Sequence, residues 1–210
     1  MIDPFPTYES LPFPPGTSPF RIKGQAYRGH VTYTNAHVPG GMDAAVAALR
    51  DPALRSFFDQ PFLAASFYDV YPLIAMGWVC ARLVGTTFHD FLRMRTRAQV
   101  DFDIGGVYRF LLRLASPGMI ATKLPTLSAQ YFDFGRVDVT TPSPNVVEGI
   151  RREIPAGIAP WIGAIGETYV VRALELNGAK NPRAKLYPWR AEGTLHGIEV
   201  GSLKCEWTWD

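Results

Sequence analysis

The sequence is poor in the residues that build metal centres and disulfides. It contains only two cysteines, Cys80 and Cys205, and neither belongs to a Cys-x-x-Cys pair. Its four histidines show no His-Glu-x-x-His or other metal-ligand spacing. The neighbours of both cysteines are largely apolar, which predicts buried thiols that behave as small hydrophobic side chains. We therefore expect no zinc enzyme, no metal site and no disulfide.

Long apolar runs and an excess of charge of one sign are also lacking. No apolar run reaches the roughly 18 residues that a membrane-spanning helix needs. Lys and Arg number 21 against 19 Asp and Glu, so the charge balance demands neither a nucleic acid nor an anionic membrane as partner. The opening MIDPFPTYESLPFPPG has no basic segment followed by an apolar stretch, which argues against a secretory signal. With 47% hydrophobic and 19% charged residues, the chain is expected to be a soluble, cytoplasmic globular protein.

The common signatures of nucleophilic and phosphate chemistry are missing as well. There is no Gly-x-Ser-x-Gly, no P-loop and no Gly-x-Gly-x-x-Gly after a strand. His89 and Asp90 are adjacent, and neighbours in a helix point to different sides, so sequence alone does not make them a relay. The basic stretch 93–97 is interpreted either as a solvated helix surface or as a contact for an anion or an acidic partner. No spacing identifies an active site.

Proline is frequent at the start of the chain and indicates where the folded domain begins. Residues 1–19 form a Pro-rich N-terminal arm that cannot be a helix or an inner strand. Residues 20–210 are predicted to form a single domain, which is long enough to bury a core. The prolines of the arm are Pro4, Pro6, Pro12, Pro14, Pro15 and Pro19.

The first half of the domain is predicted to be mostly helical. Residues 20–38 contain Ile22, Val31, Tyr33 and several threonines, which favour one interrupted strand or a hairpin. Asp51 and Pro52 then fit the N-cap and first position of a helix. Further helices are expected over 68–85, 87–114 and 117–135.

The second half changes to a strand pattern. Residues 136–155 predict strand, turn and strand, residues 159–178 predict an amphipathic helix, and residues 183–209 predict an antiparallel meander. A two-residue turn is expected at Gly201–Ser202. In the final strand four apolar side chains share one face: Leu203, Cys205, Trp207 and Trp209. The fold class is α+β, with a helical N-terminal and middle layer on a C-terminal antiparallel sheet that carries one long helix.

Aromatic residues are abundant in the helical part, and two interpretations stay open for them. They fill a helical core, or they line an apolar pocket in which tyrosine hydroxyls are the polar groups. A histidine in such a pocket is a titratable contact or a heme ligand. The residues that we predict to bind a ligand are Tyr68, Tyr71, Trp78, His89, Tyr108 and Tyr131.

The end of the chain resembles the C-terminal module of the vinyl-reductase-type small-molecule-binding domain. That superfamily also contains subunits of the TRAPP tethering complex and the heme-NO-binding domains. The pattern is carried by Ala173, Leu174 and Gly178 in the helix and by Gly201, Cys205, Trp207 and Trp209 in the hairpin. Three further stretches resemble a poorly characterised bacterial branch: Lys23-Gly24, Phe67 to Pro72, and Tyr131 to Gly135.

This resemblance implies a heme-NO-binding-like fold and a non-enzymatic sensory or adaptor domain. Its expected partners are a small hydrophobic molecule and a second copy of the chain or another protein, bound through helices. The alternative is an enzyme that acts on a hydrophobic small molecule with tyrosines and His89 as acid–base groups. Heme-binding relatives use a proximal histidine and a Tyr-x-Ser-x-Arg pattern for the propionates. Because residues 131–136 read Tyr-Phe-Asp-Phe-Gly-Arg, and His89 lies well before the expected proximal position, neither heme nor another cofactor is expected.

Overall fold

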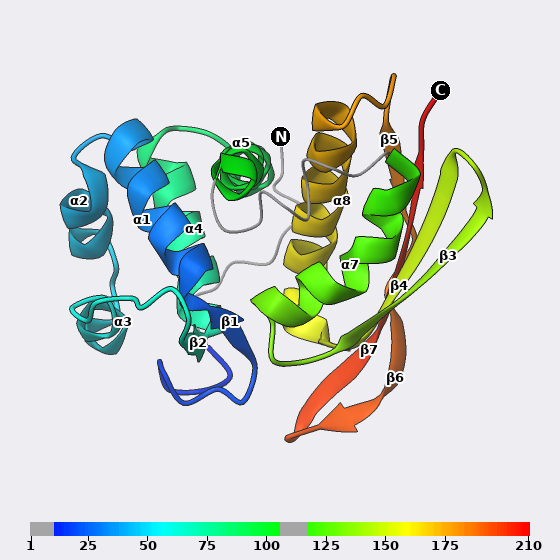
Figure 1. Ribbon diagram of the computed structural model, residues 1–210. Coiled ribbons are helices and arrows are strands. Elements are labelled where there is room, and N and C mark those ends of the chain that lie inside the picture. The colour runs from blue at the N-terminus through cyan, green and yellow to red at the C-terminus, as the bar shows by residue number, and fades with distance from the viewer. Residues whose placement is uncertain (1–10, 106–116) are drawn as a thin grey trace. The chain divides into compact units, whose positions relative to one another are not determined.

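The computed structural model describes residues 11–105 and 117–210. It confirms the predicted α+β class, with helices first and an antiparallel sheet after residue 135 (Figure 1). Contacts between backbone positions divide the chain into two compact units. We call Met1–Arg95 with Tyr131–Asp133 the helical unit, and Thr96–Gln130 with Phe134–Asp210 the sheet unit. The single domain over residues 20–210 stays a prediction.

The helical unit contains a short antiparallel pair of strands and a group of helices. In this unit α2 lies beside both α1 and α4. In Figure 1, α2 and α3 appear to the left of α1. The elements are β1 (Arg21–Lys23), α1 (Gly24–His37), α2 (Gly41–Ala47), α3 (Pro52–Phe57), β2 (Phe67–Asp69), α4 (Val70–Leu83) and the first half of α5 (Phe88–Gly105).

The predicted extended structure of residues 20–38 is wrong beyond its first residues. Only β1 is a strand, and residues 24–37 form α1. One face of α1 buries Ala26, Tyr27, His30 and Thr34, which recur at helical spacing. Two of these four side chains are polar, so the apolar pattern that reveals a helix is incomplete, and the local preference of Val31 and the threonines for strands misled the prediction.

Helix α4 is the central helix of this unit, because nearly every one of its residues is buried. It begins where the Asp69 carboxylate accepts the backbone N–H of Tyr71 at 2.9 Å, and it ends before Gly85, whose φ is +70°.

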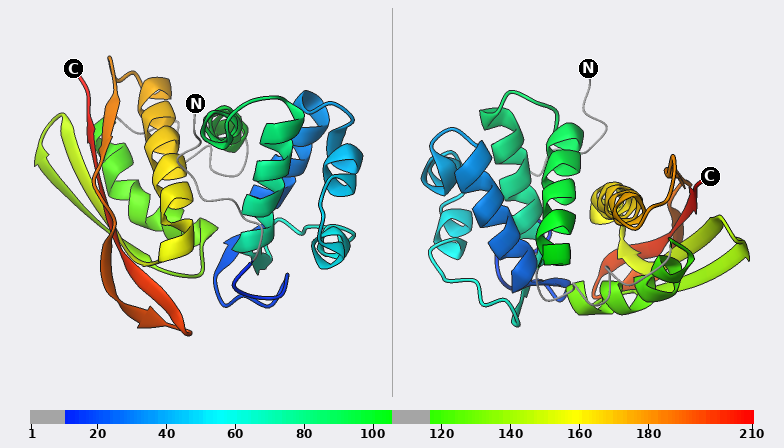
Figure 2. Two further views of the ribbon diagram at one scale, coloured as in Figure 1. Left: turned by 180° about the vertical axis from the view of Figure 1, so that it is seen from behind. Right: turned by 45° about the horizontal axis from the view of Figure 1, so that its top comes forward.

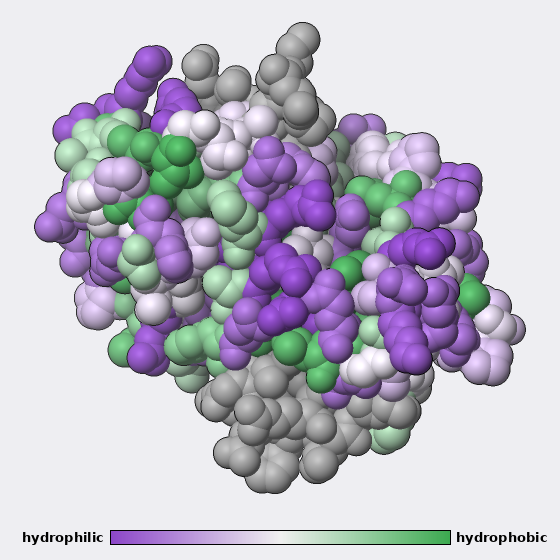
Figure 3. Space-filling view, turned by 90° about the horizontal axis from the view of Figure 1, so that it is seen from above, coloured by the Kyte–Doolittle hydropathy of each residue, from purple (hydrophilic) through white to green (hydrophobic). Residues whose placement is uncertain are grey.

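Among the described helices none is by itself long and apolar enough to span a membrane. Only α4 and Phe88–Asp103 pass that test together, as a pair bent by 109°. On the face seen from above, hydrophobic residues form separate patches among hydrophilic ones (Figure 3).

The sheet unit is built on one five-stranded antiparallel sheet. Its strands run in the order β3-β4-β7-β5, and β6 also pairs with β7. Both α7 and α8 lie on the same side of the sheet (Figure 2). The elements are α7 (Pro117–Tyr131), β3 (Arg136–Ser143), β4 (Val146–Pro155), α8 (Ala159–Leu176), β5 (Arg183–Leu186), β6 (Arg190–Leu195) and β7 (Ile198–Thr208).

The apolar face of the final strand is buried as predicted. Leu203, Cys205, Trp207 and Trp209 are each less than a tenth exposed. Helix α8 approaches this face closely at Gly163, since a Cβ there would lie 3.0 Å from Leu203 Cδ2. Small residues at this point therefore let the helix rest on the sheet.

The predicted turn at Gly201–Ser202 is wrong. Strand β7 continues through these residues, and the hairpin with β6 turns at His196–Gly197, where φ is 53° and 78°. Val200 and Leu203 are both buried although they lie three residues apart in one strand, and the neighbouring strands carry bulges at this point. Strand β4 has two residues opposite one in β7 between Arg151 and Ile154, and β6 is similarly irregular.

Candidate functional site

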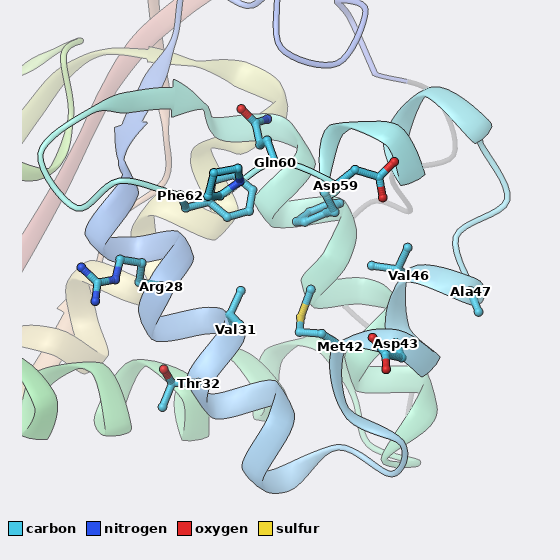
Figure 4. Close-up of a pocket in the computed structure, with 12 residues that line it drawn as sticks. Arg28, Val31, Thr32, Met42, Asp43, Val46, Ala47, Asp59, Gln60 and Phe62 are labelled. Atoms are coloured by element: carbon cyan, nitrogen blue, oxygen red, sulfur yellow. The ribbon is translucent and has the colours of Figure 1, made fainter.

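A pocket of about 610 Å³ opens in the helical unit between α1, α2 and the segment that follows α3 (Figure 4). This volume is within the range of known small-molecule sites. Every residue that lines the pocket belongs to the helical unit. They are Arg28, Val31, Thr32, Met42, Asp43, Val46, Ala47, Phe58, Asp59, Gln60, Pro61 and Phe62.

Half-buried apolar side chains form the body of the pocket. Val31 comes from α1, Met42 and Val46 come from α2, and Phe58 and Phe62 follow α3. Methionine and phenylalanine offer polarisable surface that adapts to an apolar ligand. The composition of these walls suits a hydrophobic molecule rather than a strongly hydrated one.

A tight turn between α1 and α2 sets the width of the pocket. Gly40 and Gly41 have φ of 75° and 62°, a left-handed conformation that residues with a Cβ rarely adopt. The Asn35 side-chain oxygen accepts the backbone N–H of Met42 at 2.8 Å, which fixes the start of α2. The turn thus brings α2 back beside α1.

An aromatic cluster supports the pocket from inside the unit. The rings of Tyr27 and Phe62 are stacked, with centroids 4.3 Å apart and planes inclined by 11°. Phe57 and Tyr68 add further ring contacts to this pair. The Tyr27 hydroxyl donates to the carbonyl oxygen of Asp69 at 2.5 Å, so the buried phenol has its hydrogen-bond partner. Phe62 is therefore held rigidly between this cluster and the pocket.

A cluster of polar side chains is buried where α1 meets α4. The Cys80 sulfur lies 3.8 Å from His30 Nε2 and 3.6 Å from the Thr34 hydroxyl oxygen. Burial, and next the charge of Arg95, lower the pKa of His30 to about 3, while burial raises the pKa of Cys80 to about 11. Both groups are neutral at pH 7, so the pair does not supply the thiolate that a cysteine nucleophile needs.

Asp69 fastens the described part of the arm to the helical unit. Its Oδ2 accepts the backbone N–H groups of Gly16 at 3.0 Å and Ser18 at 3.3 Å. Burial raises the pKa of this carboxyl, against the lowering effect of the N–H groups that it accepts. Together with the cap on α4, these bonds give a buried carboxylate a structural role.

Tyr68, Tyr71 and Tyr131, which we predicted as ligand contacts, lie in the helical unit. Tyr68 is half-buried in the aromatic cluster, and its oxygen accepts the Leu63 N–H at 2.9 Å. Tyr71 is buried beside Phe13, and burial raises the pKa of its hydroxyl, as does Asp69. Tyr131 is buried at the end of α7, with its ring near that of Phe132. Only Tyr68 reaches the cluster behind the pocket.

Trp78 and His89 occupy two further places, and Tyr108 lies outside the described residues. The ring of Trp78 is stacked on Phe88 at 4.5 Å. His89 is about one-third exposed, with Nδ1 3.9 Å from a carboxylate oxygen of Asp90. None of the five predicted residues that the structure describes lines the α1–α2 pocket. Their role as ligand contacts stays a prediction.

Sequence reasoning missed the residues that do line the pocket. Val31 was assigned to a strand, so its position opposite α2 could not be anticipated. The available signal was the aromatic series Phe57, Phe58 and Phe62 at and after the end of a capped helix. Three aromatic rings so close together in the sequence indicate an apolar surface in that part of the chain.

Comparison with known proteins identifies the fold. No family model and no curated protein matches the sequence, whereas solved structures of H-NOX domains match the chain over most of its length. An oxygen-binding H-NOX domain related to soluble guanylate cyclases has a TM-score of 0.61 at 8% identity, over 89% of this chain and 92% of its own. The Fe(II) unliganded H-NOX protein from K. algicida has a TM-score of 0.58 at 12% identity, over 88% and 96%. The heme-NO-binding-like fold is thus confirmed, and the likeness to vinyl-reductase-type and TRAPP proteins stays a prediction.

Our expectation against heme is wrong, because similar structures are described as heme proteins. One such structure comes from work on heme redox potential and porphyrin distortion. It has a TM-score of 0.64 at 9% identity, over 89% of this chain and 99% of its own. The expectation relied on a short sequence pattern and on the position of His89, whereas at such low identity these chains share a fold rather than a motif.

The residues of that pattern make other contacts in this chain. Asp133 accepts the backbone N–H of Arg21 at 2.8 Å, Gly135 has no side chain, and Arg136 pairs with Glu153 at 3.5 Å. A carboxylate at position 133 has the same charge as a heme propionate. These residues therefore do not fit the propionate site of the pattern, and a porphyrin bound to this chain would be held by other side chains.

Proposed function

We propose that this chain is a non-enzymatic sensory domain with the heme-NO-binding fold, and that it binds a small hydrophobic molecule in the α1–α2 pocket. The observation that carries the proposal is the pocket itself, with walls from Val31, Met42, Val46, Phe58 and Phe62. Sites of this kind are mostly apolar and carry a few polar groups that orient the ligand. Thr32 and Gln60 are such groups here.

Helix α1 would connect the ligand to the rest of the helical unit. Val31 and Thr32 face the pocket, while His30 and Thr34, their close neighbours along α1, pack against Cys80 of α4. A ligand that shifts α1 changes this buried contact, because packed interiors deform little without rearrangement. Ligand binding would thus change the packing of α1 against α4.

The character of the titratable groups favours binding over catalysis. The lining contains no histidine, cysteine or tyrosine, and its charged members are Arg28, Asp43 and Asp59. The buried His30 and Cys80 are both held neutral, and the raised pKa of Tyr71 weakens it as an acid. This supports the sensory proposal over an enzyme that uses tyrosines and His89.

A bulky substitution in the pocket tests the proposal. Val46→Trp fills the pocket from α2, whereas Ala48→Trp places the same side chain at an exposed position just outside it. We expect Val46→Trp to weaken binding of the neutral hydrophobic dye Nile red, followed by fluorescence, by about tenfold or more, and Ala48→Trp to leave it unchanged. Equal binding by both variants would contradict the proposal.

Two further measurements address the ligand and the partner. Hemin is added to the same variants, and its binding is followed by absorbance. If a porphyrin occupies this pocket, Val46→Trp should abolish the absorbance change. If it binds elsewhere, the absorbance change should persist. Native mass spectrometry of the full chain tests whether it pairs with a second copy, as the resemblance implies, and reveals any small molecule that is retained on purification.

A further inference from the structure

The charged residues at the rim of the α1–α2 pocket are not distributed evenly. Asp43 lies in the first turn of α2, and Asp59 follows α3. Arg28 belongs to α1, and Figure 4 shows it on the side opposite the two carboxylates. The lining thus has one more negative than positive charge, and both carboxylates are on the same side.

The rim charges are not neutralised by neighbours within the described part of the chain. All three side chains are exposed, and among residues 11–105 and 117–210 none of them forms an ion pair or a side-chain hydrogen bond. Several other exposed acidic groups in this protein are paired, for example Asp138 with Arg152 at 2.9 Å. Two unpaired carboxylates beside apolar walls favour a ligand that carries a positive charge.

The aromatic walls favour the same class of ligand. Tyr27 covers one face of Phe62, so that ring meets the pocket with its other face or its edge. Phe58 is a second ring in the lining. Cations, and quaternary ammonium groups in particular, bind over aromatic faces, and the attraction grows as the cation loses water.

We propose, as an extension of the function proposed above, that the ligand of the α1–α2 pocket is a small organic ammonium with a hydrophobic body. Its charged group lies on the Asp43 and Asp59 side, and its body contacts Met42, Phe58 and Phe62. This ligand class satisfies the apolar walls, the aromatic rings and the excess of negative charge together. A hydrophobic anion would instead meet two carboxylates.

Three probes that share a benzyl group test the charge of the ligand, and the first two have nearly equal shape. Benzyltrimethylammonium is a cation, neopentylbenzene is its neutral carbon analogue, and phenylacetate is an anion. We expect the full-length protein to bind the cation about tenfold more tightly than the neutral analogue, and the anion most weakly, by displacement of Nile red. The preference should shrink in high salt, because the carboxylates are exposed.

Matched variants assign the preference to the carboxylates. The double variant Asp43→Asn and Asp59→Asn should lose the tenfold preference while it still binds Nile red, which also shows that it folds. Arg28→Gln should strengthen the preference, because it removes the positive charge of the lining. A neutral or anionic probe that binds as well as the cation, no binding of any probe, or a preference that survives in the double variant would each overturn this proposal. Those results do not contradict the hydrophobic pocket as long as Val46→Trp weakens Nile red binding and Ala48→Trp does not.

Discussion

Two buried contacts, each with one cysteine at its centre, differ in character. Where α1 meets α4, Cys80 is surrounded by His30 and Thr34, which are polar. In the sheet unit, Cys205 lies between Leu203 and Trp207 on the apolar face of β7. The first contact depends on protonation and adjoins a pocket, while the second depends on shape alone. Sensitivity to ligand or pH is thus expected in the helical unit, and rigidity in the sheet unit.

The largest expected effect comes from removing a large side chain from the apolar contact. Trp207→Ala should lower the free energy of unfolding by about 3–5 kcal/mol, because it leaves a cavity over Gly149. The Trp207 ring packs so closely there that a Cβ on Gly149 would lie 2.9 Å from it. Urea unfolding measures the change. Thr208→Ala, on the opposite face of β7, serves as the control and should cost under about 1 kcal/mol.

The next effect concerns the buried carboxylate of the helical unit. Asp69→Ala should cost about 2–3 kcal/mol, because three backbone N–H groups lose their acceptor. The matched control is Asp51→Ala, which removes the exposed cap of α3 at Ala53 N and should cost about 1 kcal/mol. Urea unfolding compares the two variants. Limited proteolysis should also cut Asp69→Ala faster within residues 11–19, and equal cutting would contradict the anchoring role.

A pH effect should distinguish the polar contact from the apolar one. The folded-state pKa of His30, about 3, lies below its usual value of 6.5, so the unfolded chain takes up a proton first as the pH falls. The stability that neutral His30 contributes is complete above pH 6.5 and is lost between pH 6.5 and about pH 3. Between pH 7 and pH 5 the wild type should lose about 2 kcal/mol more than His30→Gln, measured by urea unfolding. Parallel losses in both proteins would show that His30 is not responsible.

The smallest effect should come from the ion pairs between α5 and α8 in the sheet unit. Glu175 accepts from Arg97 at 2.7 Å and from Arg172 at 3.0 Å, and the hydrogen bond from Arg97 is the main reason that its pKa is lowered. These side chains are partly exposed, so Glu175→Gln should cost under about 1 kcal/mol. Thermal unfolding at low and high salt should show this difference shrinking as salt rises. A loss that salt does not change would indicate buried rather than surface charge.

Much of the sheet unit could be predicted because its pattern is local. Period-two alternation from Leu203 to Trp209 placed four side chains on the buried face, and the structure agrees. In the helical unit, the cap formed by Asp51 and Pro52 was visible in the sequence for the same reason. The turn of the last hairpin was missed because Val200 and Leu203 are both buried in one continuous strand, and this change of apolar parity was interpreted as a turn.

The helical unit was harder to predict because its buried faces include polar groups. His30 and Thr34 complete the helical period of α1, yet neither counts as apolar in a pattern search. Their burial is favourable only in the presence of Cys80 and the rest of α4, far away in sequence. The pocket was missed for the same reason, since a strand at residues 24–37 would not place Val31 opposite α2.

The two cysteines give the chain one natural chemical probe in each unit. Burial raises the pKa of Cys80 to about 11 and that of Cys205 to about 12, and neither thiol is accessible in the folded state. A thiol reagent can therefore modify each one only when its own unit opens, and the two modification rates report the local opening of the two units separately. Single-cysteine variants would allow the opening rate of each unit to be measured separately, without any added label.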